Sequence, residues 1–142
     1  MPKGPRVLLD VNVILDVLQR REPFLADSAS VMAAVESGRC EGLIAAHTVT
    51  TLFYLMTKHA SATVARVHVI ELLRVLKVAQ VDQGVLEEAL ALPYADIEDA
   101  VQMAAAERAG AEYLVTRDRA GYSAGPLPTL APGELLPLLG GA

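Results

Sequence analysis

The stretch that decides the fold is residues 7–16, which read VLLDVNVILD. The first three residues form a short apolar run typical of a buried strand, and residues 13–18 then continue as a helix. Asp10 lies where the strand ends, with apolar residues on both sides. Because an acidic side chain is costly to place in such surroundings, we expect Asp10 to have a functional role.

Short apolar runs and longer helical stretches alternate through the rest of the chain. Further strands are predicted at residues 43–45, 78–81 and 113–115, and residues 129–130 are a candidate last strand. Helices are predicted at residues 27–37, 48–59, 61–75 (capped by Ser61 or Thr63), 82–92, 97–109 and 132–140, with a loop at 121–128. This alternation implies right-handed βαβ crossovers. We therefore expect a three-layer α/β/α sandwich around a parallel sheet of four or five strands.

The composition favours one soluble domain spanning residues 1–142. A chain of this length with 53% hydrophobic residues can build a core without disulfides. Cys40 is the only cysteine, so a cytoplasmic location is the simplest expectation. Lys3 and Arg6 precede an apolar run as in a secretory signal, but acidic residues interrupt that run. No stretch reaches the ~18 apolar residues of a membrane helix, so no membrane association is expected.

The net charge is −5, whereas proteins that bind nucleic acid mainly by neutralising phosphates are normally basic. A nucleic-acid role here therefore needs a local site in which metal ions supply positive charge, and a basic partner protein is the other reading. The apolar share exceeds the usual 45–50% even without glycine. It predicts a homodimer, or a partner whose apolar helix covers an exposed groove.

Four aspartates fall where a parallel sheet forms its site, beyond the carboxyl ends of the strands. Asp10 follows the first strand and Asp118 follows the strand at residues 113–115. Asp96 and Asp99 occupy the first turn of the helix that leads into that strand. Clustered carboxylates repel one another, and a hard divalent cation such as Mg²⁺ relieves the conflict. Such an ion can activate a water and neutralise a phosphate.

Each acid also has an ordinary structural explanation, and Asp10 could end the strand as a turn former. Asp96 is placed as a helix N-cap, and Asp99 in a first turn gains from the helix dipole. Asp118 could be a plain loop residue. Asp16 lies six residues after Asp10, off the face of Asp10, and is expected to be solvated. Four further acids are expected on exposed helix faces: Glu87, Glu88, Glu98 and Glu107.

Three segments of the chain resemble the PIN domain family. Residues 7–16 resemble the opening strand and helix of PIN domains, residues 96–102 (DIEDAVQ) resemble their third acidic motif, and residues 114–118 (LVTRD) resemble the fourth. Each motif is weak alone. Their order, spacing and match to the predicted topology across essentially the whole chain are specific.

The resemblance implies a metal-dependent endoribonuclease, often the toxin of a VapBC-type toxin–antitoxin pair with a small antitoxin protein as partner. By this analogy Asp10, Asp99 and Asp118 bind Mg²⁺ or Mn²⁺ and carry the catalysis. Asn12 and Thr116 support them by hydrogen bonding. The residues considered for contact with an RNA backbone are Arg117, Arg20 and Arg21.

One position departs from the family pattern. PIN domains usually carry a Glu early in the helix after the second strand, and Thr51 stands there in this chain. A threonine can hydrogen-bond a metal-bound water but adds no charge, so weaker metal affinity is expected, with Asp96 as a compensating acid.

Three other functions are alternatives to the nuclease. A non-catalytic PIN-like binding module is favoured by Thr51. A phosphoacceptor receiver domain needs a Lys beyond the last strand, and no Lys follows Lys77. A haloacid-dehalogenase-like phosphatase needs a second Asp two residues after Asp10, where Asn12 stands.

Overall fold

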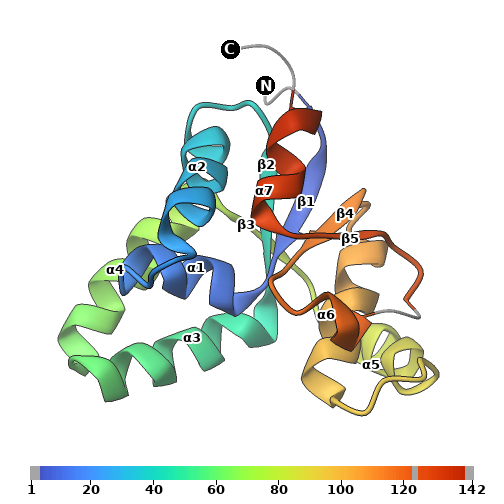
Figure 1. The fold of residues 1–142 in the computed structure, drawn as a ribbon. Helices are drawn as coiled ribbons and strands as arrows, with labels where there is room; N and C mark the ends of the chain where they lie inside the picture. Colours follow the sequence, from blue (N-terminus) through green and yellow to red (C-terminus); the bar gives the residue numbers. More distant parts are fainter. Residues whose placement is uncertain (1–3, 123–124, 140–142) are drawn as a thin grey trace.

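A parallel sheet of five strands in the order β3-β2-β1-β4-β5 forms the centre of the computed structural model, which describes residues 4–122 and 125–139 (Figure 1). The central strand β1 (Arg6–Leu9) pairs with β2 (Glu41–Ala45) on one side and β4 (Tyr113–Val115) on the other. The outer strands are β3 (Lys77–Ala79) and β5 (Thr129–Leu130). The predicted parallel sheet is confirmed, and residues 129–130 do form its fifth strand.

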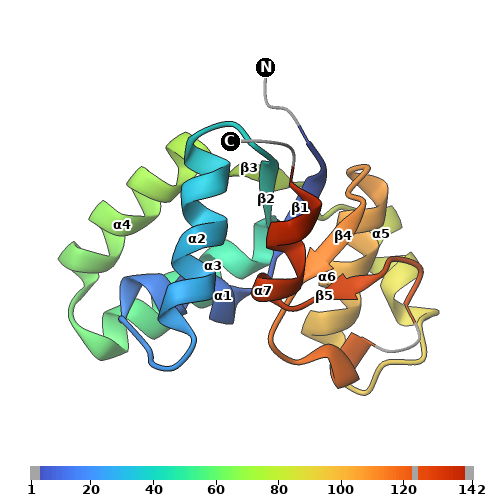
Figure 2. The same cartoon turned by 45° about the horizontal axis from the view of Figure 1, so that its top comes forward.

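Helices cover both faces of the sheet, as the alternation of elements predicted (Figures 1 and 2). Val7 and Leu9 of β1 pack into one buried cluster, and Leu8 packs into the other. The first cluster lies under α1 (Val11–Leu18), α2 (Leu25–Glu36), α3 (Ala46–His59), α4 (Ala62–Val75) and α7 (Pro132–Leu135). The second lies under α5 (Gln83–Leu90) and α6 (Ile97–Arg108). The three-layer α/β/α fold is therefore confirmed.

Several predicted boundaries shift for local reasons. Helix α1 begins at Val11, two residues early, because the Asp10 carboxylate caps it by accepting from the Val11 amide. Strand β3 ends at Ala79 and not at Val81. The terminal helix was predicted to reach Gly140, but after Leu135 the chain tightens into the 3₁₀ helix η2 (Leu136–Leu138). Pro137 lies within η2 and has no amide hydrogen for an α-helical bond. Gly140 lies outside the described residues.

The predicted loop at residues 121–128 is shorter at its start. A 3₁₀ helix, η1 (Arg119–Tyr122), includes its first two residues, and positions 123–124 lie outside the described residues. As predicted, side-chain caps open three other helices: Ser61 for α4, Asp82 for α5 and Asp96 for α6. Within residues 4–122 and 125–139, no helix has the length and apolar character needed to span a membrane.

Candidate active site

Asp10 lies where β1 passes into α1 and is 7% exposed. Its Oδ1 accepts hydrogen bonds from the Val11 amide at 2.7 Å and from Nε2 of Gln102 at 3.1 Å. Its Oδ2 accepts from the Thr116 hydroxyl at 2.8 Å. Both oxygens are thus held, and the plane of the carboxylate is fixed.

Thr116 and Asp118 follow β4 on the same edge of the sheet. The Thr116 hydroxyl donates to Asp10 and accepts from the Asp118 amide at 3.0 Å, so it connects the two acidic segments. Asp118 itself is exposed. Thr116 is therefore in hydrogen-bonding contact with Asp10, the kind of contact that the family resemblance implies for it.

Asp99 lies in the first turn of α6, which begins on this edge. Asp96 caps the helix by accepting from the Asp99 amide at 3.2 Å. Oδ2 of Asp99 and Oδ2 of Asp118 each lie 3.3 Å from the point where a Cβ of Gly121 would stand. The two carboxylates therefore face one small space, which the absence of a side chain at Gly121 leaves open.

Gln102 and Tyr122 join Asp10 to Asp99, and neither was predicted as a site residue. Nε2 of Gln102 donates to Asp10 and also to the Tyr122 hydroxyl at 2.8 Å. The Tyr122 hydroxyl in turn donates to Oδ1 of Asp99 at 3.0 Å. Gln102 is three residues after Asp99 and so shares its helix face, which is a signal that sequence could supply. Tyr122 had no comparable signal.

A pocket of about 220 Å³ opens between these side chains. Its described lining includes no Lys, Arg or His and is dominated by acids, together with Asn12, Thr48 and Thr51. The lining acids are Asp10, Asp96, Glu98, Asp99 and Asp118. Four acids predicted on exposed helix faces are exposed, but one of them, Glu98, also lines this pocket.

Burial raises the pKa of Asp99 to about 6, although the Tyr122 hydrogen bond acts to lower it. The negative charges of Asp96, Asp10 and Asp118 raise it further. Burial and the nearby carboxylates also raise the pKa of Tyr122, which keeps its hydroxyl protonated as a donor. The pocket thus concentrates negative charge, and a cation would relieve it.

The donor set suits a hard divalent cation, because carboxylate oxygens are the ligands that Mg²⁺ and Mn²⁺ prefer. Among the described residues, no three acidic, His or Cys side chains stand close enough to ligate one ion together. Gln102 and Tyr122 lie between Asp10 and Asp99. Because Mg²⁺ commonly binds through one or two carboxylates and keeps several waters, the arrangement remains a fit.

Thr51 lines the pocket from α3. Its hydroxyl donates to the backbone oxygen of His47 at 3.4 Å. Asn12 also lines the pocket, and its Oδ1 accepts from Nη1 of Arg21 at 3.1 Å. Arg21 is therefore hydrogen-bonded to a lining residue, but neither Arg21 nor the exposed Arg20 is itself among the lining residues.

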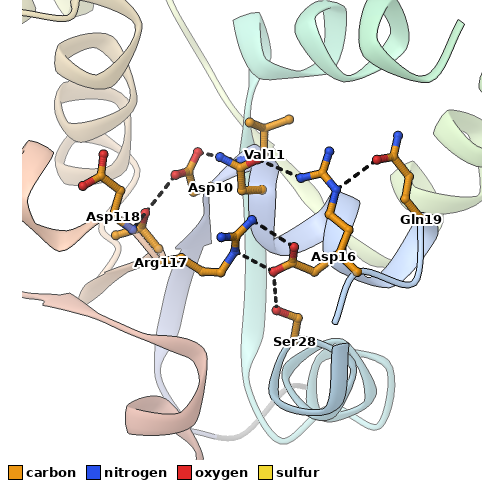
Figure 3. Close-up of polar contacts among 10 residues, drawn as sticks. Asp10, Val11, Asp16, Gln19, Ser28, Arg117 and Asp118 are labelled. Atoms are coloured by element: carbon orange, nitrogen blue, oxygen red, sulfur yellow. Dashed lines mark hydrogen bonds and ion pairs between the residues drawn. The ribbon is translucent and has the colours of Figure 1, made fainter. Parts of the chain in front are cut away.

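The prediction that Asp16 is solvated is wrong. Asp16 is fully buried and forms a two-pronged ion pair with Arg117 (Figure 3). As expected, the Asp16 side chain points away from Asp10. It points toward α2 and the segment after β4, however, and not into solvent. Arg117, a predicted RNA-contact residue, points to Asp16, and its guanidinium carbon lies 3.8 Å from the ring centre of Phe24.

A family model described as a PIN domain matches residues 6–120. The match covers most of the chain, so this chain belongs to the PIN domain family. No curated protein matches the sequence.

Several solved structures share the fold. VapBC2 from Rickettsia felis, bound to a DNA fragment from its promoter, has a TM-score of 0.68 at 12% identity and covers 89% of this chain and 98% of that chain. FitAcB from Neisseria gonorrhoeae has a TM-score of 0.68 at 18% identity, and the match covers 89% of this chain and 97% of that chain. VapC20 from Mycobacterium tuberculosis, described as a sarcin–ricin loop cleaving toxin, has a TM-score of 0.62 at 15% identity, with 76% and 86% covered.

Proposed function

We propose that this protein is a cytoplasmic, metal-dependent endoribonuclease and the toxin of a toxin–antitoxin pair. The observation that carries the proposal is the meeting of Asp10, Asp99 and Asp118 from three distant segments at one acidic pocket. Membership of the PIN family and the description of the fold neighbour VapC20 as a toxin that cleaves the sarcin–ricin loop support the choice of RNA.

Asp99 and Asp118 would hold Mg²⁺ or Mn²⁺ through the oxygens that face the space beside Gly121. Asp10, with both oxygens engaged, would bind through the ion's own waters or exchange one hydrogen bond. The ion would supply positive charge for the phosphate and lower the pKa of a bound water. Thr116, Gln102 and Tyr122 orient the carboxylates, as hydrogen-bonding partners commonly do for metal ligands.

The substrate would approach a pocket that repels phosphate until the metal is bound. Arg21 reaches the pocket lining through the hydrogen bond that its guanidinium donates to Asn12. Contact between Arg21 and the RNA backbone therefore remains our proposal, with Arg20 beside it.

One fold neighbour is described as a toxin–antitoxin complex from Klebsiella pneumoniae, with a TM-score of 0.67 at 20% identity. This chain also has a groove of about 320 Å³ that shares no lining residue with the acidic pocket. Its apolar lining residues are Ile14, Val17 and Leu18 of α1, Met32 of α2, and Leu72 and Val75 of α4, and four polar residues line it as well: Glu36, His68, Glu71 and Arg74. A small antitoxin with an apolar helix would fit such a groove.

The second candidate function is a PIN-like module that binds without cleaving. Thr51 favours it, because the side chain at that edge of the pocket adds no charge. Metal binding without cleavage of any RNA would support this reading.

The experiment compares wild type with Asp99→Asn and Asp118→Asn on one labelled single-stranded RNA, in Mn²⁺, Mg²⁺ or EDTA. Each variant should lose at least roughly tenfold in rate, because the loss of a hydrogen-bonding partner of a metal ligand already costs about that much and the loss of the ligand itself costs no less. Glu107→Gln is the matched control, since Glu107 is exposed near the far end of the same helix and does not line the pocket. Equal cleavage by wild type and Asp99→Asn would indicate a contaminating nuclease or another site, and the binding module would then lead.

A further inference from the structure

The Asp16 carboxylate is fully buried and accepts three hydrogen bonds, which connect three segments of the chain (Figure 3). Its Oδ2 accepts from Nε of Arg117 at 2.9 Å and from the Ser28 hydroxyl at 3.0 Å. Its Oδ1 accepts from Nη2 of Arg117 at 3.1 Å. Asp16 belongs to α1, Ser28 to α2, and Arg117 to the segment after β4. The cluster therefore ties that segment to two helices.

Arg117 lies in sequence between the two residues that serve the pocket from this segment. Thr116 donates to Asp10, and Asp118 supplies a carboxylate. Figure 3 shows the side chains of Arg117 and Asp118 leaving the backbone in different directions, one toward Asp16 and the other away from it. Because Asp118 is exposed, its position depends on the backbone that carries it.

The geometry of the ion pair restricts that backbone more than apolar packing would. A two-pronged Arg–carboxylate pair fixes the guanidinium in direction and in plane. Phe24 adds a second constraint, with its ring centre 3.8 Å from the guanidinium carbon. A buried ion pair is weak evidence for a gain in folding stability, because well-packed apolar residues can often replace such a pair without lowering the free energy of unfolding. Precise placement of the segment is what the pair supplies and what an apolar substitute would lack.

We infer that Asp16 and Arg117 are positioning residues, which hold Thr116 and Asp118 in the arrangement that binds the metal ion. This inference rests on the proposed function for its meaning. It assigns Arg117 a role within the protein in place of contact with RNA.

The test separates positioning from stability. Asp16→Asn alone leaves the guanidinium without its charge partner and is expected to destabilise the fold. The informative variant combines Asp16→Leu, Arg117→Met and Ser28→Ala, which replaces the cluster by apolar groups and leaves no polar partner unsatisfied. Arg117→Lys is a second variant, because it keeps the charge and loses the two-pronged geometry. Arg119→Gln is the matched control. Arg119 lies two residues after Arg117, and this variant removes the exposed ion pair that Arg119 forms with Glu134.

Each variant is measured in three ways: thermal unfolding, Mn²⁺ titration by calorimetry, and hydrogen exchange of the Asp118 amide, which is bonded to Thr116 in the wild type. The triple variant should keep its melting temperature, lose roughly tenfold in Mn²⁺ affinity, and exchange the Asp118 amide faster. Arg117→Lys should show the same losses in smaller measure, and Arg119→Gln should match wild type.

Wild-type Mn²⁺ affinity and wild-type amide exchange in both cluster variants would overturn the inference. In that case, a KM for RNA that rises in Arg117→Lys in the cleavage assay described under the proposed function would assign Arg117 to substrate contact instead. Absence of Mn²⁺ binding in the wild type would refute the proposed function instead, and the exchange of the Asp118 amide would still decide whether the cluster positions this segment. If the triple variant does not fold, Arg117→Lys decides by the same readings.

Discussion

The Tyr122 hydroxyl donates a hydrogen bond to Oδ1 of Asp99 at 3.0 Å, and this phenol is only 2% exposed. The carboxylate whose pKa is raised to about 6 is therefore held by a donor from the segment after β4. Asp99 therefore has a fixed orientation and, among the described residues, no basic side chain bonded to its carboxylate, and these are the two properties that its proposed role as a metal ligand requires.

Tyr122→Phe should raise the pKa of Asp99 above 6, because the hydrogen bond that lowers it is lost while burial and the neighbouring charges remain. The carboxyl carbon of Asp99, followed by NMR through a pH titration, reports this shift. Tyr113→Phe is the control, since Tyr113 lies in β4 and does not line the pocket. An unchanged titration in Tyr122→Phe would mean that the hydrogen bond does not act on Asp99.

Stability without metal should depend on pH through Asp99. Its pKa is about 4 in an unfolded chain and about 6 in the folded protein, so between these values only the folded state keeps the proton. The stability that this carboxyl contributes is therefore full below pH 4 and is lost as the pH rises through 6. Asp99→Asn should become more stable than wild type by about 1 kcal/mol at pH 7, after allowance for solvent screening.

Thermal unfolding of both proteins in EDTA at pH 4, 5, 6 and 7 measures this difference. Adding Mn²⁺ at pH 7 should favour the wild type again, because ion binding stabilises only the protein with an intact ligand set. Melting temperatures that run parallel from pH 4 to pH 7 would contradict the raised pKa.

The outer surface of α4 should form a homodimer contact. Val64, Val67, Ile70 and Leu73 are all exposed there, whereas the helix buries only Ala65 and Leu72. Val67→Lys with Ile70→Lys should give a monomer with an intact helix, because Lys is a better helix former than either residue. Light scattering at tens of micromolar measures the mass, and Leu90→Lys on α5 in the other helical layer is the control. A wild-type monomer at that concentration would contradict the dimer.

The sheet and the three acidic segments could be predicted from sequence because both depend on chain direction. Residues 7–16 show where a strand ends and a helix begins, and parallel strands bring their carboxyl ends to one edge. That rule placed Asp10, Asp99 and Asp118 correctly at one pocket without any knowledge of side-chain contacts.

Side-chain partners from distant segments could not be predicted in the same way. Helical periodicity correctly turned Asp16 away from Asp10, but it carries no information on what a helix packs against. Here the partners are Ser28, twelve residues on, and Arg117, 101 residues on. Tyr122 donates to Asp99 from the end of η1, a segment that follows α6 and β4 along the chain. Such contacts require the packed structure.

Thr51→Glu should restore the acid that PIN domains usually carry at this edge of the pocket and so strengthen ion binding. The half-maximal Mn²⁺ or Mg²⁺ concentration for RNA cleavage should fall, while the rate at saturating ion changes little, because the added charge acts on ion affinity more than on the chemistry. Without metal the variant should be less stable, since one more carboxylate joins a pocket already lined by Asp10, Asp99 and Asp118. Calorimetry and cleavage assays over the same ion range measure both effects.

Thr50→Glu is the matched control, because Thr50 is exposed and is not among the pocket-lining residues. If the half-maximal ion concentration fell equally in Thr50→Glu, the effect would come from general surface charge and not from the pocket. Weaker ion binding in Thr51→Glu than in wild type would show that the pocket has adapted to threonine.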